Sequence, residues 1–277
     1  MSIPKIIHQI WLQGTSYISD KSKERIDKIK SIHEISNGDY KGEYKGSGGH
    51  SVWIYRLWDE VQILQLLQTL DKKYIDKYYK FTYLHQKVDY AKFIILKVYG
   101  GIYIDIDCNV IKNLDGLFEH VKDYDFVVSY LLPTDKIINY FTCGYTSRCI
   151  NNGIIISKKN TDICNYIIDQ LKYECNNSNN KINCIQNTTG PVIFNKIIYT
   201  YVNNNNKSKV LILPPEFLEP CFFDKCVNNE NTYIEHIHER TWVSGNIVNL
   251  LGIFNKYNII IYTMCIIIIS CIIIYNL

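Results

Sequence analysis

Two carboxylates, Asp105 and Asp107, interrupt an apolar stretch of the sequence and stand one residue apart. Side chains at positions i and i+2 of a strand share one face, so we expect both carboxylates to point toward the same place. Mutual repulsion would raise the pKa of one carboxyl unless a cation lies between them. A hard divalent cation bound through oxygen is the natural partner. The pair therefore predicts a metal site, with two aspartates in an exposed turn as the alternative interpretation.

The residues before the pair predict the elements that position it. Helical periodicity over residues 85–99 is followed by Gly100 and Gly101, a typical helix stop. Residues 102–106 then read as an apolar strand, with the two aspartates near its carboxyl end. Ligands of open α/β sheets bind outside the carboxyl ends of strands, so we expect a ligand site at this sheet edge.

Strand-like and helix-like segments alternate along the chain, which favours an α/β fold built in layers. The expected strands also cover residues 3–11, 51–58, 126–131, 153–157 and 210–213. The other expected helices cover residues 22–35, 58–70 and 162–174, with one more after Pro191. Residues 37–49 hold five glycines among polar residues and predict a surface loop.

The composition narrows the class of protein. A chain of 277 residues with 47% hydrophobic residues can bury a sizeable core and is not wholly disordered. Lysine and arginine total 30 and aspartate and glutamate 27, without a basic block, so nucleic acid is not an expected partner. We expect one globular domain over residues 1–255.

The ten cysteines show no regular spacing, and a chain of this size does not need disulfides, so we predict mostly reduced thiols. Cys221, Cys226, His236 and His238 raise the alternative of a zinc site. Their spacing fits no common zinc finger, so this alternative is the weaker one.

The last part of the chain is apolar. Residues 259–275 are 17 residues without a charge, at the short limit for crossing a hydrocarbon core of about 30 Å. We predict a single-pass C-terminal membrane anchor over residues 257–277, with a buried terminal strand or helix as the alternative. Lys256 precedes this segment, and the positive-inside rule would then leave the globular domain in the cytosol.

Further polar and aromatic residues have two interpretations each. Asp89 and Lys92 share a face of the predicted helix, where they either bind sugar hydroxyls or form a surface salt bridge of little energetic value. Trp11 follows the first strand, and its ring either stacks on a nucleobase or fills the core. His236, with Thr241 and Trp242 downstream, is either a metal ligand or a structural histidine.

Taken in order, these motifs resemble glycosyltransferase family 32, a group with a DXD sugar-binding motif that includes initiating α-mannosyltransferases and sphingolipid mannosyltransferases. The matching residues are 3–11, 53–59, 89–107, Asn152-Gly153, Thr189-Gly190-Pro191, and His236 six residues before Trp242. The resemblance covers most of residues 3 to 243, and the block at residues 89–107 is its most specific part.

The resemblance implies a GT-A (Rossmann-like) nucleotide-sugar-binding fold, in which helices flank a mixed central sheet. It implies a retaining transfer of a hexose from GDP-mannose or a UDP-hexose to a glycan, glycolipid or protein acceptor. A divalent cation, manganese or magnesium, is the implied cofactor.

Residue roles carry over one at a time from the same resemblance. Trp11 would stack on the base of the donor, and Asp89, beside Lys92, would contact the hydroxyls of the donor sugar. Asp105 would touch the ribose and the sugar. Asp107 would bind the metal directly.

The C-terminal motif supplies the rest of the implied site. His236 would be a further metal ligand, while Thr241 and Trp242 belong to the segment that closes over the diphosphate. Asn152 would approach the reacting face of the sugar, which completes a catalytic set with the two aspartates of the DXD motif.

Two departures from the family pattern motivate a second hypothesis. Family members usually carry arginine where Lys92 stands and serine where Thr241 stands, and lysine lacks the bidentate guanidinium fork. A non-catalytic module that binds a sugar nucleotide or a glycan is therefore the alternative function. A magnesium-dependent phosphoryl transferase would share the acidic pair, but the chain has no glycine-rich Walker loop, so we rank it last.

Overall fold

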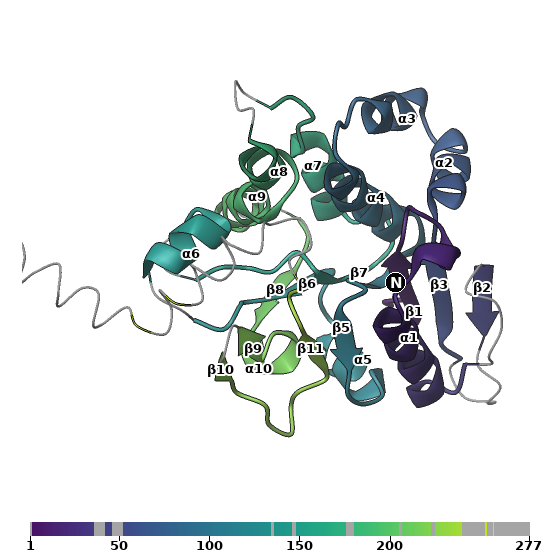
Figure 1. Ribbon diagram of the computed structural model, residues 1–277, viewed down its shortest axis with the longest axis vertical. Helices are drawn as coiled ribbons and strands as arrows, with labels where there is room; N and C mark the ends of the chain where they lie inside the picture. The colour runs from purple at the N-terminus through teal and green to yellow at the C-terminus, as the bar shows by residue number, and fades with distance from the viewer. Residues whose placement is uncertain are drawn as a thin grey trace, which may run out of the picture.

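The computed structural model describes residues 2–35, 42–45, 52–133, 136–145, 148–175, 180–204, 207–222 and 225–239, together with Ile253 and Tyr257. A seven-stranded sheet runs through this part of the chain (Figure 1). Its strands are β1 (Ile6–Ile10), β2 (Gly42–Lys45), β3 (Ile54–Trp58), β4 (Gly101–Ile104), β6 (Phe126–Ser129), β7 (Ile154–Ser157) and β8 (Val210–Leu213). They lie in the order β2-β3-β1-β4-β7-β6-β8.

Helices cover both faces of this sheet (Figure 1). One face carries α2 (Glu60–Gln68), α3 (Lys72–Tyr79), α4 (Leu84–Tyr99), α7 (Asp162–Gln170), α8 (Lys181–Thr188) and α9 (Pro191–Asn203). The other face carries α1 (Asp20–Ile32), α5 (Asp115–Val121) and α10 (Pro215–Leu218). Helix α6 (Lys136–Cys143) packs against α9, and the short 3-10 helix η1 (Thr15–Tyr17) follows β1.

The sheet is mixed. Strand β1 pairs in parallel with β3 and β4, and β6 pairs in parallel with β8. The pairs β2 with β3, β4 with β7, and β6 with β7 are antiparallel. Two small antiparallel sheets add to it, β5 (Cys108–Val110) with β11 (Ile234–His236), and β9 (Cys221–Phe222) with β10 (Lys225–Cys226). A mixed central sheet flanked by helices is the fold class that the sequence predicts.

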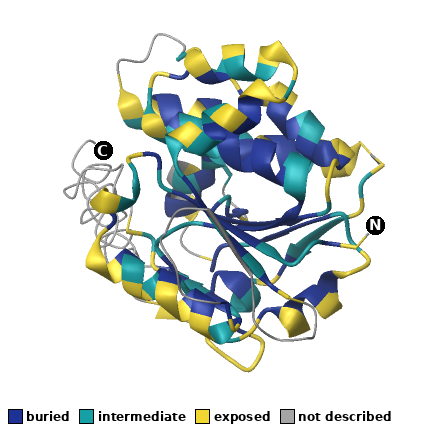
Figure 2. Cartoon of the chain, turned by 90° about the vertical axis from the view of Figure 1, so that its right-hand side faces the viewer, coloured by how far each residue is buried: buried dark blue, intermediate teal, exposed yellow. Residues whose placement is uncertain are grey.

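Apolar residues on both sides of each central strand explain why helices must cover both faces. In β4, Ile102 and Ile104 belong to the core under α1 and α5, whereas Tyr103 belongs to the core under α4 and α7. Neighbouring β7 repeats the pattern, with Ile155 alone on the α4 side. A strand buried on both faces is apolar throughout, because successive side chains point to opposite sides. Figure 2 shows these strands buried between helices whose outer faces are exposed.

The predicted elements agree with the structure except near their ends. The predicted strand at residues 210–213 is β8, and the predicted helix at residues 85–99 is α4. The strand expected at residues 102–106 ends earlier, at Ile104. Within the expected loop at residues 37–49, residues 42–45 form β2, so the loop prediction is wrong there, and the other residues of that loop lie outside the described part.

The double glycine after α4 has a steric reason. Gly100 and Gly101 adopt φ angles of 65° and 97°, which L-amino acids with side chains rarely reach. A Cβ atom on Gly101 would also collide with the carbonyl oxygen of Ile6 on the neighbouring strand. The helix stop that the sequence predicts is therefore also the point where β4 enters the sheet beside β1.

His8 lies in the middle of β1 and is completely buried. Its Nδ1 accepts a hydrogen bond from the indole N–H of Trp58 at 3.1 Å, and its Nε2 donates to the carbonyl oxygen of Gly100 at 2.9 Å. Because an indole nitrogen only donates, both ring nitrogens are satisfied in the neutral ring alone. Burial lowers the pKa of His8 to about 3, with Arg56 lowering it further and Gly100 opposing the shift.

We predict that His8 makes the fold sensitive to acid. The unfolded chain takes up a proton on this ring below its usual pKa of about 6.5, while the folded protein resists protonation down to a pKa of about 3. The stability from His8 is therefore present above that range and lost as the pH falls through it, at about 1.4 kcal/mol per pH unit. Urea unfolding at pH 7, 5.5 and 4 measures this loss in the wild type.

The matched variant for this test is His8→Gln, whose amide can donate and accept but does not titrate. Wild type and variant share every other ionisable group, so the difference between their unfolding free energies should shrink or reverse as the pH falls. Two stability curves that stay parallel across this range would contradict the prediction.

Three disulfides correct the prediction of mostly reduced thiols. Cys143 pairs with Cys149, Cys175 with Cys184, and Cys221 with Cys226. Within the described residues, Cys108 and Cys164 are free thiols, and both are buried. The zinc alternative is wrong for the same reason, because Cys221 and Cys226 are joined to each other. The regular spacings used to recognise disulfide frameworks missed these pairs, because each joins cysteines only five to nine residues apart.

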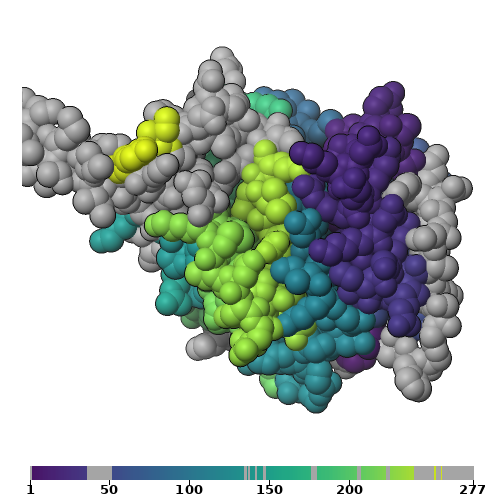
Figure 3. All heavy atoms as spheres, turned by 60° about the horizontal axis from the view of Figure 1, so that its bottom comes forward, coloured from purple at the N-terminus to yellow at the C-terminus, as the bar shows by residue number. Residues whose placement is uncertain are grey.

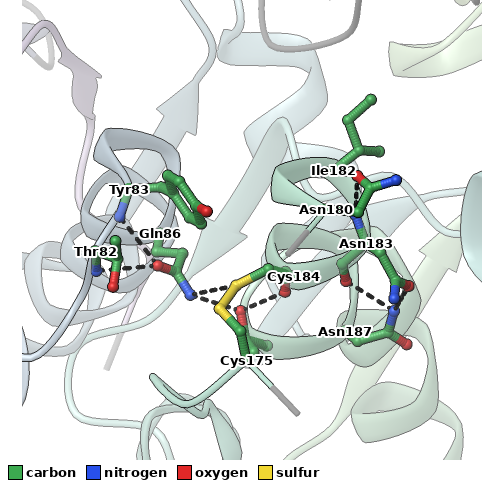
Figure 4. The surroundings of a disulfide bond; sticks show 10 residues. Thr82, Tyr83, Gln86, Cys175, Asn180, Ile182, Asn183, Cys184 and Asn187 are labelled. Atoms are coloured by element: carbon green, nitrogen blue, oxygen red, sulfur yellow. Dashed lines mark hydrogen bonds between the residues drawn. A yellow bond between two sulfur atoms is a disulfide. The ribbon is translucent and has the colours of Figure 1, made fainter. Parts of the chain in front are cut away.

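The Cys175–Cys184 bridge ties the segment after α7 to α8 (Figure 4). Gln86 of α4, seen beside the bridge in Figure 4, accepts the backbone N–H of Tyr83 at 3.1 Å. Its amide N–H donates to the hydroxyl of Thr188 on α8 at 2.8 Å. The bridge thus ties α8 to the segment after α7, and Gln86 ties α8 to α4.

Removing the Cys175–Cys184 bridge should lower the free energy of unfolding, because the unfolded chain without it has more conformational freedom. Its cysteines are nine residues apart, and closing a loop of that size removes about 2–3 kcal/mol of unfolded-state entropy. We expect the double variant Cys175→Ser, Cys184→Ser to lose roughly that much unfolding free energy in urea. Peptide mapping without reduction is the check on the premise: alkylation of both thiols in the denatured wild type would refute the pairing.

The predicted anchor at residues 257–277 lies outside the described residues, apart from Tyr257. Within the part of the chain that the structure describes, no helix has both the length and the apolar character to span a bilayer.

Candidate active site

The two aspartates lie in the turn between β4 and β5, rather than within the strand. The backbone N–H of Asp105 donates to the carbonyl oxygen of Gly153 at 2.8 Å, and the Gln9 amide donates to the carbonyl oxygen of Asp105 at 3.3 Å. The turn closes with a hydrogen bond from the N–H of Cys108 to the carbonyl oxygen of Asp105 at 3.1 Å. The carboxylates therefore converge because of a tight turn, not because of the strand pleat that the sequence suggested.

Strand β11 brings His236 to this turn from the far end of the described chain. Antiparallel pairing of β11 with β5 places His236 opposite Cys108. The Nε2 atom of His236 lies 3.1 Å from Oδ1 of Asp107 and 4.0 Å from Oδ2 of Asp105. Figure 3 shows the segments that form this face side by side, with residues after 210 in green, residues near 110 in teal and the N-terminal residues in purple.

The chain beyond β11 also holds Asp107. The backbone N–H of Ile237 donates to the carbonyl oxygen of Asp107 at 3.1 Å, and that of Glu239 donates to its Oδ2 at 2.9 Å. One carboxylate oxygen of Asp107 thus faces His236, and the other is fixed by the backbone.

The pKa values of the two aspartates move in opposite directions. Burial raises the pKa of Asp105 to about 6, and the charge of Asp107 adds to this while Lys92 and His236 oppose it. Burial also works against ionisation of Asp107, but His236 and the backbone N–H of Glu239 outweigh it and hold its pKa below the usual range. The raised pKa of Asp105 is thus mainly an effect of burial, to which the repulsion predicted from the sequence adds a smaller part.

A second cluster of polar side chains surrounds Asp89 on α4. Nζ of Lys92 lies 2.6 Å from Oδ1 of Asp89 and donates to the carbonyl oxygen of Asn152 at 2.9 Å. The hydroxyl of Thr189 donates to Oδ2 of Asp89 at 3.0 Å, and the amide of Asn152 donates to Oδ1 at 3.3 Å. The Lys92 side chain is only 2% exposed, so the alternative of a surface salt bridge is wrong and the pair is a buried one.

This cluster adjoins the aspartate turn. Asn152 and Gly153 precede β7, whose residue Ile154 pairs with Ile104 at the end of β4. The charge of Lys92 is felt at Asp105, where it lowers the carboxyl pKa. The structure thus brings together six of the residues that the sequence singled out: Asp89, Lys92, Asp105, Asp107, Asn152 and His236.

Trp11 directly follows β1, and its backbone N–H donates to the carbonyl oxygen of Trp58 at 2.8 Å. Its ring is partly buried against the core under α1. Among the described residues, nothing accepts a hydrogen bond from its buried indole N–H. Contact with a base stays a prediction for this residue.

The residues around the turn fit a divalent cation. Asp107, Cys108 and His236 offer ligand atoms that lie within 4.8 Å of one another, and Oδ2 of Asp105 lies 4.0 Å from Nε2 of His236. Carboxylate oxygens and an imidazole nitrogen are donor atoms that manganese, magnesium or zinc accepts in proteins. Gly153 keeps the approach open, because a Cβ atom there would lie 2.6 Å from both Oδ2 of Asp105 and Cε1 of His236. Asp107, His236 and Asp105 are the side chains that would hold the ion.

Known proteins share this arrangement of motifs in sequence. The family model described as a glycosyltransferase sugar-binding region containing a DXD motif matches residues 44–126. An uncharacterized glycosyltransferase of Acanthamoeba polyphaga mimivirus is 30% identical over 267 residues, which cover 94% of this chain and 91% of that protein. The chain belongs to the DXD glycosyltransferase family. The glycosyltransferase is also 25% identical over 138 residues to inositol phosphoceramide mannosyltransferase 1 of Schizosaccharomyces pombe, covering 50% of its own length and 36% of the yeast protein.

Among solved structures, the glycosyltransferase gives a TM-score of 0.47 with mouse xyloside xylosyltransferase 1, at 8% identity over 87% of this chain and 100% of that one. The PaToxG glycosyltransferase gives a TM-score of 0.43, at 19% identity over 73% of this chain and 71% of that one. Scores of this size do not establish a shared fold.

The glycosyltransferase has site residues that the sequence motifs did not reveal. Glu219 and Asn151 contact His236, and the hydroxyl of Tyr103 donates to Oδ1 of Asp105 at 2.6 Å. The ring of His238, named in the sequence only for the zinc alternative, stacks on that of His236. Glu219 could have been singled out in the sequence for the same reason as the aspartate pair. It is a charged residue within an otherwise apolar stretch, Phe217-Leu218-Glu219-Pro220. Thr241 and Trp242 lie outside the described residues, so their implied roles stay predictions.

Proposed function

We propose that this glycosyltransferase moves a hexose from a nucleotide sugar to a glycan, glycolipid or protein acceptor, with a divalent cation at the Asp105 and Asp107 turn. The observation that carries the proposal is the convergence of both carboxylates with Nε2 of His236. A mixed sheet with helices on both faces is consistent with the proposed GT-A fold.

The side chains of the site would mainly position the donor sugar and stabilise the charge that develops on the departing diphosphate. A divalent cation bound here acts as a Lewis acid on the departing diphosphate. Asp89, held by Lys92, Asn152 and Thr189, presents a fixed carboxylate to the hydroxyls of the donor sugar. Tyr103 orients Asp105 by donating its hydroxyl hydrogen to one carboxylate oxygen, leaving the other toward His236.

Retention of the anomeric configuration is part of the proposal. It rests on the family resemblance. We propose a front-face route for it, in which the leaving phosphate helps to deprotonate the acceptor, and such a route requires no enzymic nucleophile. Proton NMR of the first product formed from an α-linked donor would report the configuration directly.

The donor class is tested by nucleotide release. Purified protein with manganese is incubated with GDP-mannose, UDP-glucose, UDP-galactose and UDP-N-acetylglucosamine, and released nucleotide is measured with and without EDTA. GDP-mannose comes first because two relatives from Schizosaccharomyces pombe are named as inositol phosphoceramide mannosyltransferases. Release that requires manganese supports the proposal, whereas tight donor binding without hydrolysis or transfer from any donor favours the non-catalytic module.

The apolar segment at residues 257–277 is proposed as a membrane anchor on its sequence alone. We expect deletion of residues 257–277 to move the protein from the membrane pellet to the supernatant after expression, while manganese-dependent nucleotide release persists. A deletion variant that still pellets with membranes at high salt would contradict the anchor.

A further inference from the structure

A buried glutamate lies behind His236, on the side away from the aspartates. Glu219 ends the short helix α10 and has no exposed surface. Isolating a carboxylate from water is costly unless hydrogen bonds and opposite charges compensate for it. The contacts of Glu219 therefore show which groups compensate for the burial of its charge.

Both carboxylate oxygens of Glu219 face histidines. Oε1 lies 3.0 Å from Nδ1 of His236, and Oε2 lies 3.0 Å from Nε2 of His238. The two imidazole rings stack with their centroids 3.9 Å apart. Burial opposes ionisation of Glu219, but the two histidines hold its carboxyl pKa below the usual range. Glu219 is accordingly an anion that faces two imidazole rings.

The position of Glu219 determines which nitrogen of His236 is available to a cation. The two nitrogens of an imidazole lie on opposite edges of the ring, and here Nδ1 faces Glu219 while Nε2 faces Asp107 at 3.1 Å. A carboxylate beside Nδ1 requires that Nδ1 carry a hydrogen. Nε2 faces the carboxylate of Asp107 in the same way, so both ring nitrogens carry a hydrogen while no cation is bound. A cation at Nε2 would replace the hydrogen on that nitrogen, while Glu219 keeps the hydrogen on Nδ1.

Asn151 links this pair to the rest of the site. Its amide nitrogen donates to Oε1 of Glu219, and its amide oxygen accepts the backbone N–H of Gly153 at 2.9 Å. Gly153 in turn accepts a hydrogen bond from the backbone N–H of Asp105. A displacement of Glu219 would therefore reach both the histidine and the aspartate turn.

We infer that Glu219 is a positioning residue, which fixes His236 as the Nδ1–H tautomer and directs its Nε2 at the cation held by Asp105 and Asp107. The inference rests on the proposed metal-dependent function. Metal-binding histidines commonly donate their second N–H to a carboxylate, and loss of such a partner weakens metal affinity 10- to 100-fold. The cation is of the divalent class that oxygen and imidazole ligands share, with manganese as the probe.

The experiment measures manganese binding rather than turnover. Free Mn²⁺ is titrated into the full chain by electron paramagnetic resonance, and electron spin echo modulation detects a histidine nitrogen bound to the ion. The variant Glu219→Leu removes the acceptor for Nδ1–H, and we expect roughly 100-fold weaker binding and loss of the nitrogen signal. Glu219→Gln keeps an amide oxygen but turns an NH₂ group toward a donor, so we expect roughly 10-fold weaker binding.

A control variant and the wild type distinguish a failure of this inference from a failure of the proposed function. Glu216→Gln, on the same helix α10, is the matched control and should bind manganese as the wild type does. If the wild type itself binds no manganese, the proposed metal-dependent function fails. If the wild type binds manganese and the Glu219 variants bind it within twofold, with the nitrogen signal intact, the inference alone is overturned. Should Glu219→Leu fail to fold by circular dichroism, the same criterion applies to Glu219→Gln.

Discussion

Replacing Asp107 with asparagine should lower kcat/KM for manganese-dependent transfer by about 1000-fold or more, since the cation contributes several kcal/mol of charge stabilisation. Asparagine keeps the shape of the side chain and can still accept the backbone N–H of Glu239, which now lies 2.9 Å from Oδ2. The fold should therefore survive while the anionic ligand is lost. Nucleotide release and calorimetric manganese titration measure the two effects on the same preparation.

The matched control for this substitution is Asp123→Asn, an exposed aspartate outside the site. Its activity and manganese affinity should equal those of the wild type. An Asp107→Asn protein with unchanged manganese dependence would remove Asp107 from the metal site, whatever the behaviour of the control.

Adding a single methyl group at Gly153 should also cost about 100-fold in kcat/KM, because displacement of catalytic groups by about 1 Å has effects of that size. The new Cβ atom would lie 2.6 Å from Oδ2 of Asp105 and from Cε1 of His236, so both side chains must move. Gly153 is not among the glycines with a positive φ, and alanine suits its backbone. The effect is therefore one of space at the site rather than of backbone strain.

Steady-state kinetics of Gly153→Ala, with circular dichroism and thermal unfolding on the same sample, separates a local displacement from a loss of fold. We expect a native spectrum, weaker manganese binding and a lower kcat. A variant with nearly wild-type activity would mean that the turn at Asp105 and the ring of His236 can separate without consequence, contrary to the tight contact described above.

Residues close in sequence made the central part of the site predictable. Helix α4, its glycine stop and the two aspartates lie within residues 84–107, where periodicity and apolar patterning operate. The sequence also indicated the correct partners for Asp89, because Lys92 is three residues away on one helix face. It could not decide between a surface pair and a buried one, since burial of Lys92 and Asp89 depends on Asn152 and Thr189 from distant segments.

The other contacts of the site could not be predicted from the sequence, because they depend on elements that are far apart along the chain. Strand β11 is three residues long and has no apolar run that would reveal it, yet its pairing with β5 aligns His236 with Cys108. Glu219 reaches His236 only because α10 and β11 fold against each other. The disulfides were missed because size and spacing rules for cysteines say little about three short local bridges.

The late position of β11 has a consequence for how the enzyme is made. A ribosome delivers the DXD turn long before His236, which follows Asp105 by 131 residues (236 minus 105). Domains generally fold as units, so this domain cannot complete its fold before its last strands have been made. The carboxylate pair would therefore exist for much of translation without its imidazole partner or the backbone donors of residues 237 and 239. A nascent or truncated chain that ends before residue 236 carries the complete sugar-binding motif but only part of the site.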